Sequence, residues 1–156
     1  MVDDASTPPV DAPSNCTLLR RDTNGGPAAA RNTGLAAVDS PLVAFIDADV
    51  TVDDGWLEPL LAHFSDPRVA LVAPRVASAE AAGLIGAYEH RHSPLDLGTE
   101  PASIAAGTRV SYVPAAALVC RTDVIRSLGG FDESMRVGED VDLVWRLVDA
   151  GHRARY

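Results

Sequence analysis

The stretch LVAFIDAD, residues 42–49, decides the fold. Its first five residues form an uninterrupted apolar run, which is typical of a strand that is covered on both faces. Two acidic residues, Asp47 and Asp49, follow the run directly. Ligands of open α/β sheets bind at the carboxyl ends of the strands, so the sequence predicts that both side chains lie at a binding edge. A solvated acidic turn is the alternative, because two Asp residues spaced in this way are common.

Predicted helices and strands alternate around this stretch. Before it, residues 16–20 predict a short strand, and residues 27–38 predict a helix that begins at a proline. After it, residues 55–64 predict an amphipathic helix, and residues 69–73 predict a second buried strand. This alternation favours an α/β fold with a mostly parallel sheet flanked by helices.

The second half of the sequence is less regular. We expect a helix over 79–90, a long loop over 93–108 and a strand over 112–120. A short helix over 122–128 and a last helix from about Glu139 complete the prediction. Loops as long as the 93–108 segment are more often functional than idle.

Composition limits the possible classes of protein. The 156 residues suit one domain, and 47% apolar with 22% charged residues is ordinary for a globular protein. Acidic residues outnumber basic ones 22 to 13, giving a net charge of -9. A nucleic-acid groove needs a basic face to neutralise phosphates, so nucleic acid is excluded as a partner.

The sequence also predicts the compartment. No stretch approaches the roughly 18 to 20 apolar residues of a membrane helix, and Met1 is not followed by a signal peptide. Cys16 and Cys120 are far apart without metal-type spacing, so we interpret them as buried thiols in a reducing compartment. We therefore expect a cytoplasmic protein, or the cytoplasmic part of a longer one that is membrane-associated.

Three further groups of charged residues could take part in chemistry. Glu139 and Asp140 stand at the start of the last helix, where the helix dipole favours negative charge. A carboxylate held there could accept a proton from an attacking hydroxyl, although simple helix stabilisation is the alternative. Asp3 and Asp4, taken alone, read as a frayed acidic terminus. Arg31, in the first predicted helix, could face a phosphate or pair with an acid.

Together, these segments resemble family 2 glycosyltransferases of the GT-A fold. The matching segments, in order, are VDDAS (2–6), NGGPAAARNTGLAAV (24–38), LVAFIDADV (42–50), GWLEPLLAHF (55–64), VALVAPRV (69–76), GGFDE (129–133) and GEDVDLVWRLVDAGHRARY (138–156). The stretch YEHRHSPLDLG (88–98) also looks like the actinobacterial glycosyltransferases associated with the peptide-derived redox cofactor mycofactocin.

The resemblance implies inverting, metal-dependent transfer of a sugar from a nucleotide sugar to an acceptor hydroxyl. The implied donor is a UDP-sugar, with UDP-glucose as the family's usual example, and the implied cofactor is Mn²⁺ or Mg²⁺. The acceptor stays open among a glycan, a lipid and a peptide-derived cofactor. The acid pair before the last helix matches Glu139 and Asp140, with Asp140 as the general base.

The resemblance also implies which residues hold the nucleotide and the metal. The acid of the DDxS-type segment that contacts the base matches Asp4, and secondarily Asp3. Asp47 matches the DxD aspartate that is closer to the ribose, and Asp49 matches the direct metal ligand. Arg31 is grouped with the same nucleotide-binding residues.

Family members usually begin with an apolar strand and a helix before the DDxS-type segment. We therefore expect the chain to lack this first strand and helix and to be an internal fragment, truncated at both ends, of a single GT-A domain over residues 1–156. An inactive domain that mainly self-associates is the non-enzyme alternative, because a bare sheet edge favours pairing with another chain.

A phosphatase of the haloacid-dehalogenase class is the main rival enzyme. Residues 47–51 (DADVT) fit its DxDxT pattern, in which Asp47 would be the nucleophile. That class normally uses a downstream Lys to hold the phosphate, and this chain has none. Its DxD also follows the opening strand, whereas here a predicted strand and helix come first.

Overall fold

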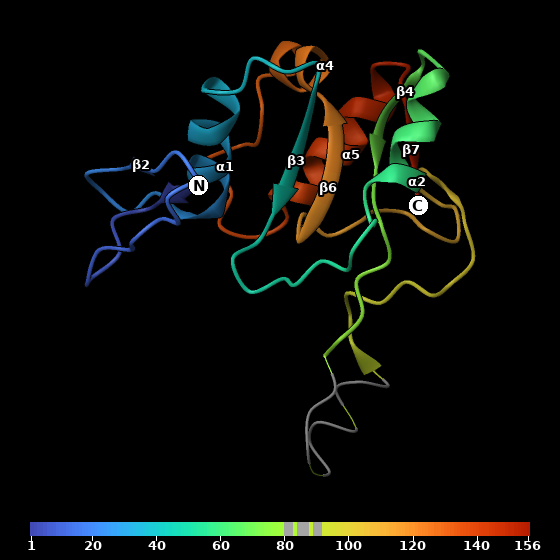
Figure 1. Ribbon diagram of the computed structural model, residues 1–156. Helices are drawn as coiled ribbons and strands as arrows, with labels where there is room; N and C mark the ends of the chain where they lie inside the picture. The colour runs from blue at the N-terminus through green and yellow to red at the C-terminus, as the bar shows by residue number, and fades with distance from the viewer. Residues whose placement is uncertain (80–82, 84–87, 89–91) are drawn as a thin grey trace.

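A five-stranded sheet lies at the centre of the computed structural model, which describes residues 1–79, 83, 88 and 92–156. In spatial order its strands are β3 (Leu42–Ile46), β6 (Ala117–Arg121), β4 (Val69–Val72), β7 (Arg153–Arg155) and β5 (Ser103–Ile104). Figure 1 shows β3 and β6 side by side, with β4 next along the sheet.

The strand directions are mixed, so the prediction of a mostly parallel sheet is wrong. β3 and β4 both pair antiparallel with β6, β4 pairs parallel with β7, and β5 pairs antiparallel with β7. Local alternation of helices and strands identifies the strands themselves. It does not reveal that β6, from much later in the chain, inserts between β3 and β4, and sheets of mixed direction are common in α/β folds.

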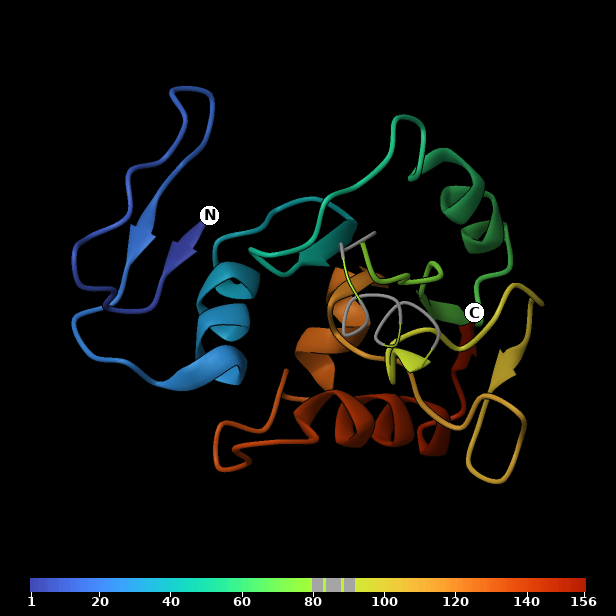
Figure 2. The same cartoon turned by 90° about the horizontal axis from the view of Figure 1, so that it is seen from below.

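A separate parallel pair is formed by β1 (Val2–Asp3) and β2 (Leu19–Arg20). Helix α1 (Gly26–Ala36) follows this pair and lies between it and β3 (Figure 2). The predicted helix is therefore confirmed, while the predicted strand over 16–20 is limited to its last two residues. Cys16 is exposed, so its prediction as a buried thiol is wrong; Cys120 is buried as predicted.

Helices lie on both sides of the sheet. α5 (Glu139–Asp149) is behind it and α2 (Glu58–Leu61) in front of it in Figure 1, and Figure 2 shows them on opposite sides. The predicted helix over 55–64 forms only as α2 and the 3-10 turn η1 (Ala62–Ser65). The short helix α4 (Thr122–Ser127) follows β6 as predicted.

Apolar side chains from the strands and from α4 and α5 meet in one core. The largest fully buried ones are Leu71, Leu118, Ile125, Phe131, Leu143 and Leu147. The predicted strand over 112–120 is regular only from Ala117 onward. The predicted helix over 79–90 falls almost entirely outside the described residues. Within the part that is described, no helix has the length and hydropathy needed to cross a membrane.

Candidate active site

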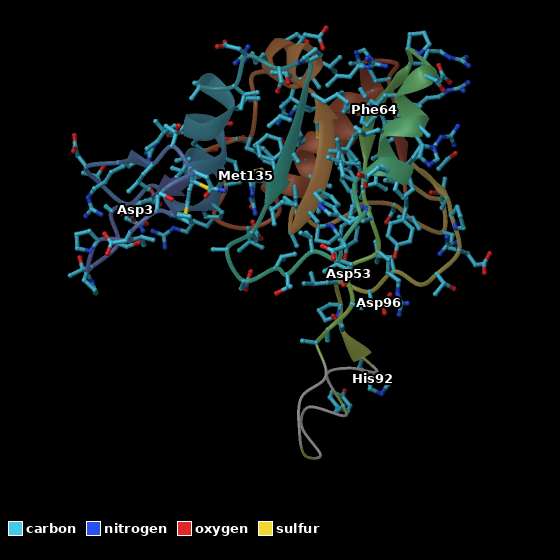
Figure 3. All side chains as sticks on the ribbon, in the orientation of Figure 1. Asp3, Asp53, Phe64, His92, Asp96 and Met135 are labelled. Atoms are coloured by element: carbon cyan, nitrogen blue, oxygen red, sulfur yellow. The ribbon has the colours of Figure 1, made fainter. Side chains whose placement is uncertain are left out.

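The carboxyl end of β3 positions the two aspartates of the DAD segment. Val43 and Phe45 are buried and anchor the strand, and the backbone N–H of Asp47 donates to the carbonyl of Ala116 at 3.0 Å. Asp49 is exposed and makes no hydrogen bond or ion pair with the rest of the described chain. In Figure 3 the loop that follows, marked by Asp53, lies below the lower edge of the sheet.

Arg31 joins this segment to the start of α5. Its Nη2 lies 2.7 Å from Asp47 Oδ1, and its Nη1 lies 2.8 Å from Glu139 Oε1. The Arg31 side chain is only 12% exposed. Its guanidinium stands 5.4 Å from the centre of the Phe131 ring, a distance suited to a cation–π contact. One guanidinium therefore binds two carboxylates that are far apart in the sequence.

The side-chain amide of Asn32 binds the backbone of Phe131 and so fixes the Phe131 ring beneath Arg31. Asn32 Nδ2 donates to the Phe131 carbonyl at 2.8 Å, and the Phe131 N–H donates to Asn32 Oδ1 at 2.9 Å. Gly130 has φ +74°, and a Cβ there would collide with the Asn32 amide oxygen. Sequence analysis did not identify Asn32 or Phe131. The available signal was an Asn directly after Arg31 in an Ala-rich helix, together with the Gly-Gly-Phe turn.

The amino terminus of α5 presents the second acidic pair. Gly138, with φ +87°, turns the chain into the helix. Glu139 is buried against Arg31, whereas Asp140 is half-buried and accepts a hydrogen bond from the Ala115 N–H at 3.2 Å on Oδ2. Ala115 and Ala116 are neighbours in sequence, so this short backbone segment contacts both Asp140 and Asp47. The structure therefore brings together four of the predicted site residues: Arg31, Asp47, Glu139 and Asp140.

The donor chemistry at this edge suits a hard divalent cation. Asp47 and Asp49 offer carboxylate oxygens, the ligand type that Mg²⁺ and Mn²⁺ prefer. Within the described residues, no group of three or more His, Cys, Asp or Glu side chains gathers as metal ligands. This is compatible with Mg²⁺-type sites, which use one or two carboxylates and complete the shell with substrate phosphates and water.

Asp3 lies away from this cluster, on the β1–β2 unit (Figure 3). Its side chain is buried, accepts a hydrogen bond from the Ser6 N–H at 2.9 Å, and pairs with Arg20. Hydrogen bonding from Ser6, supported by Val10 and by the charge of Arg20, holds the pKa of the Asp3 carboxyl below its usual range. The carboxylate of Asp3 therefore closes a turn.

Asp4 completes the amino terminus of α1. Its carboxylate accepts hydrogen bonds from the N–H groups of Gly25 and Gly26, the latter at 2.7 Å. Arg21 Nε lies 2.7 Å from the other oxygen. Because a helix leaves its first N–H groups without intrahelical partners, this carboxylate stabilises the helix that carries Arg31.

A groove of about 690 Å³ runs along α1, and its lining includes Pro27, Arg31 and Gly34 of that helix. Of the described residues in its lining, Arg31 and Asp47 are the two with charged side chains. Apolar residues of β1, α1 and β3, including Val2, Gly34 and Phe45, line the remainder. The volume is in the range of ordinary ligand pockets. The groove therefore offers a ligand a mostly apolar lining together with one ion pair.

The chain matches the family model described as "Glycosyl transferase family 2" over residues 1–127. It is 53% identical over its whole length to the "Pre-mycofactocin glycosyltransferase" of Mycobacterium tuberculosis, and it spans 35% of that relative's length. It is also 29% identical, over 88% of its residues, to "Glycosyltransferase AglE" of Haloferax volcanii, of which the match covers 44%.

Solved structures share the fold at low sequence identity. A mannosyltransferase from Pyrobaculum calidifontis, in complex with GDP-Man and Mn²⁺, superposes with a TM-score of 0.63 at 19% identity, covering 88% of this chain and 36% of that one. S. aureus TarS in complex with UDP gives 0.65 at 18% identity, covering 91% and 43%. The structural similarity supports a GT-A type of α/β fold, and the sequence match shows that the chain belongs to glycosyl transferase family 2.

Proposed function

We propose that this chain carries the donor-binding and catalytic site of an inverting glycosyltransferase that moves a sugar from a UDP-sugar to an acceptor hydroxyl. One observation carries the proposal: at the carboxyl end of β3, Arg31 binds both Asp47 and Glu139, and Asp140 follows Glu139 at the start of α5. A groove large enough for a nucleotide opens at the same place. Family membership favours sugar transfer over the phosphatase alternative with Asp47 as nucleophile.

Asp49 and Asp47 would hold Mn²⁺ or Mg²⁺ together with phosphate oxygens of the donor. When bound, the ion would offset the negative charge that develops on the diphosphate leaving group. Asp49 suits this role because its carboxylate is exposed and has no partner within the described chain. The presence of Mn²⁺ with GDP-Man in the Pyrobaculum relative supports the same type of cofactor.

Asp140 would act as the general base. Its carboxylate is oriented by the Ala115 N–H and stands at the amino terminus of α5. An ionised carboxylate behind the sugar carbon can accept the proton of the attacking hydroxyl. Glu139 is buried and bound to Arg31, so we assign it a positioning role beside Asp140.

The nucleotide would lie along the groove between α1 and β3. Val2 also lines this groove, so Asp3 and Asp4, the next residues in the chain, are near the place proposed for the base. Both carboxylates already stabilise local structure, and we propose that any contact with the base uses their remaining lone pairs. UDP as the nucleotide is supported by its presence in the TarS structure.

We propose a peptide-derived acceptor of the pre-mycofactocin type. The support is the 53% identity to a pre-mycofactocin glycosyltransferase over the whole of this chain. A donor panel of UDP-glucose, UDP-N-acetylglucosamine and GDP-mannose, assayed by release of the nucleoside diphosphate with such a peptide, tests the proposal. We expect UDP-glucose to be preferred and the anomeric configuration to be inverted, as read by NMR of the product.

Two results would overturn this function. Retention of the anomeric configuration would exclude the single-displacement mechanism in which Asp140 is the base. A phosphorylated Asp47, trapped with a phosphate-monoester substrate and located by mass spectrometry, would favour the phosphatase instead.

A further inference from the structure

The two carboxylates bound by Arg31 differ in their access to solvent. The Glu139 side chain is 9% exposed, whereas the Asp47 side chain is 37% exposed. Water and dissolved ions can therefore reach the pair between Arg31 and Asp47, while the pair with Glu139 is largely enclosed. A competing cation can therefore displace the hydrogen bond between Arg31 Nη2 and Asp47.

Several contacts fix Arg31 independently of Asp47. Its guanidinium lies over the Phe131 ring, and that ring packs edge-on against Phe45 with 5.1 Å between centroids. Asn32, the next residue of α1, binds the Phe131 backbone from both sides. The positive charge would therefore stay beside Asp47 even when the ion pair opens.

A positive charge fixed beside a metal-binding carboxylate must weaken its affinity for a cation. Arg31 occupies Asp47 Oδ1 through a charge-assisted hydrogen bond of 2.7 Å. An entering divalent ion must replace this bond and also overcome the repulsion from the guanidinium. Asp49 has no such neighbour among the residues described, so the competition is specific to Asp47.

We propose that Arg31 is a positioning residue that also competes with the divalent cation for Asp47. Arg31 Nη1 stays bound to Glu139 throughout. Arg31 Nη2 stays bound to Asp47 until metal and nucleotide bind together. The nucleotide diphosphate brings the negative charge that makes the exchange favourable, so metal alone binds weakly. This inference rests on the proposed metal role of Asp47 and Asp49.

The proposal predicts effects of opposite sign in one variant. Arg31→Met removes the competing charge, so its affinity for Mn²⁺ alone should rise by about 3- to 10-fold. Its transfer rate should fall, because Glu139 loses the partner that positions it. A purely structural role for Arg31 would instead weaken Mn²⁺ binding and lower the rate together.

The measurement is a titration of this chain with Mn²⁺ alone, in which the electron paramagnetic resonance signal reports unbound ion. Arg31→Lys keeps a positive charge and should bind Mn²⁺ within about twofold of the wild type. Arg68→Met is the matched control, because Arg68 is an exposed arginine paired with Asp66, outside the site. It loses the same charge and should not change the affinity.

Arg31→Met leaves Glu139 as a buried carboxylate without its partner, which can destabilise the fold. The double variant Arg31→Met with Glu139→Gln removes that charge, and its Mn²⁺ affinity should still rise, by a smaller factor than in Arg31→Met because a negative charge near the site is also lost. Circular dichroism confirms that each variant is folded before titration. Equal or weaker Mn²⁺ binding in the folded double variant, relative to wild type, overturns the inference.

Adding UDP separates this inference from the proposed function. A gain in Mn²⁺ affinity without any UDP binding supports the competition and contradicts the glycosyltransferase proposal. Mn²⁺-dependent UDP binding in the wild type, without a gain in Mn²⁺ affinity in the Arg31 variants, supports the glycosyltransferase proposal and contradicts the competition. Absence of Mn²⁺ binding in every protein overturns both.

Discussion

The chain contains two acidic segments that look alike in sequence and differ in structure. Asp3 and Asp4 have carboxylates occupied by backbone N–H groups and by Arg20 and Arg21. In the DAD segment, residues 47–49, the Asp47 carboxylate has one partner among the described residues, Arg31, and the Asp49 carboxylate is exposed.

We interpret this difference as one between carboxylates that stabilise the fold and carboxylates that are candidates for binding a metal ion. A carboxylate whose lone pairs are filled by N–H donors stabilises a turn or a helix end, and a cation gains little there. A carboxylate held at the end of a strand that is anchored by buried residues, with open lone pairs, is preorganised for a ligand. If this contrast is correct, substitutions in the two groups should differ in their effects on transfer, metal binding and stability.

Asp140→Asn should lower the transfer rate by about 10³-fold, since an amide cannot accept the acceptor's proton. UDP binding in the presence of Mn²⁺ should stay within about twofold, because Asp140 is outside the proposed metal site. Asp149→Asn, at the exposed end of the same helix, is the control and should keep wild-type turnover. Normal turnover in Asp140→Asn would show that another group is the base.

Gly130→Ala should lower the free energy of unfolding by about 2–3 kcal/mol, because the new methyl group collides with the Asn32 amide. Gly129→Ala is a matched control: its φ is also positive, at +84°, but a Cβ there would meet nothing within 4 Å. Urea unfolding of both variants isolates the cost of displacing Asn32 and Phe131. If both variants lost the same free energy of unfolding, the hydrogen bonds between Asn32 and Phe131 would add no stability.

Asp49→Ala should weaken Mn²⁺-dependent binding of UDP by at least about tenfold, because the exposed carboxylate is the proposed direct metal ligand. Asp54→Ala removes an exposed acid from the same loop and should leave the affinity within about twofold. Calorimetry measures both. A similar loss in the two variants would indicate general electrostatic attraction rather than a ligand.

Asp3→Asn should lower the Tm by about 2–4 °C and leave Mn²⁺ affinity unchanged, because this carboxylate closes a turn. The lowered pKa of Asp3 sets the pH dependence. The ionised form is favoured in the folded state, so the Tm difference should be complete at pH 6 and should shrink as the pH falls below about 4. A difference that persists unchanged at low pH would exclude the carboxylate charge as its cause.

Much of the site was predictable because its residues lie at the ends of strongly patterned elements. The apolar run before Asp47 and the amphipathic last helix after Gly138 are local signals, and both elements form. The acidic residues that follow or begin them therefore fall at the expected edge. The prediction that β3 is covered on both faces is wrong, because Ala44 and Ile46 are exposed.

What could not be predicted depends on long-range contacts. The insertion of β6 between β3 and β4 makes the sheet mixed, and no local pattern encodes it. The same limit applies to Arg31: its charge and helix were predicted, but its choice between a phosphate and an acid was left open. The helix over 55–64 was overpredicted, because its apolar stripe is only partly buried and Leu61 stays 40% exposed.

Calorimetric titration of UDP with and without Mn²⁺ tests most directly the claim that the DAD segment is a metal-dependent nucleotide site. We predict binding heat when Mn²⁺ is present, its loss when the metal is chelated, and its strong reduction in Asp49→Ala but not in Asp54→Ala. Equal UDP binding with and without metal, or no UDP binding by the folded chain, would contradict the account.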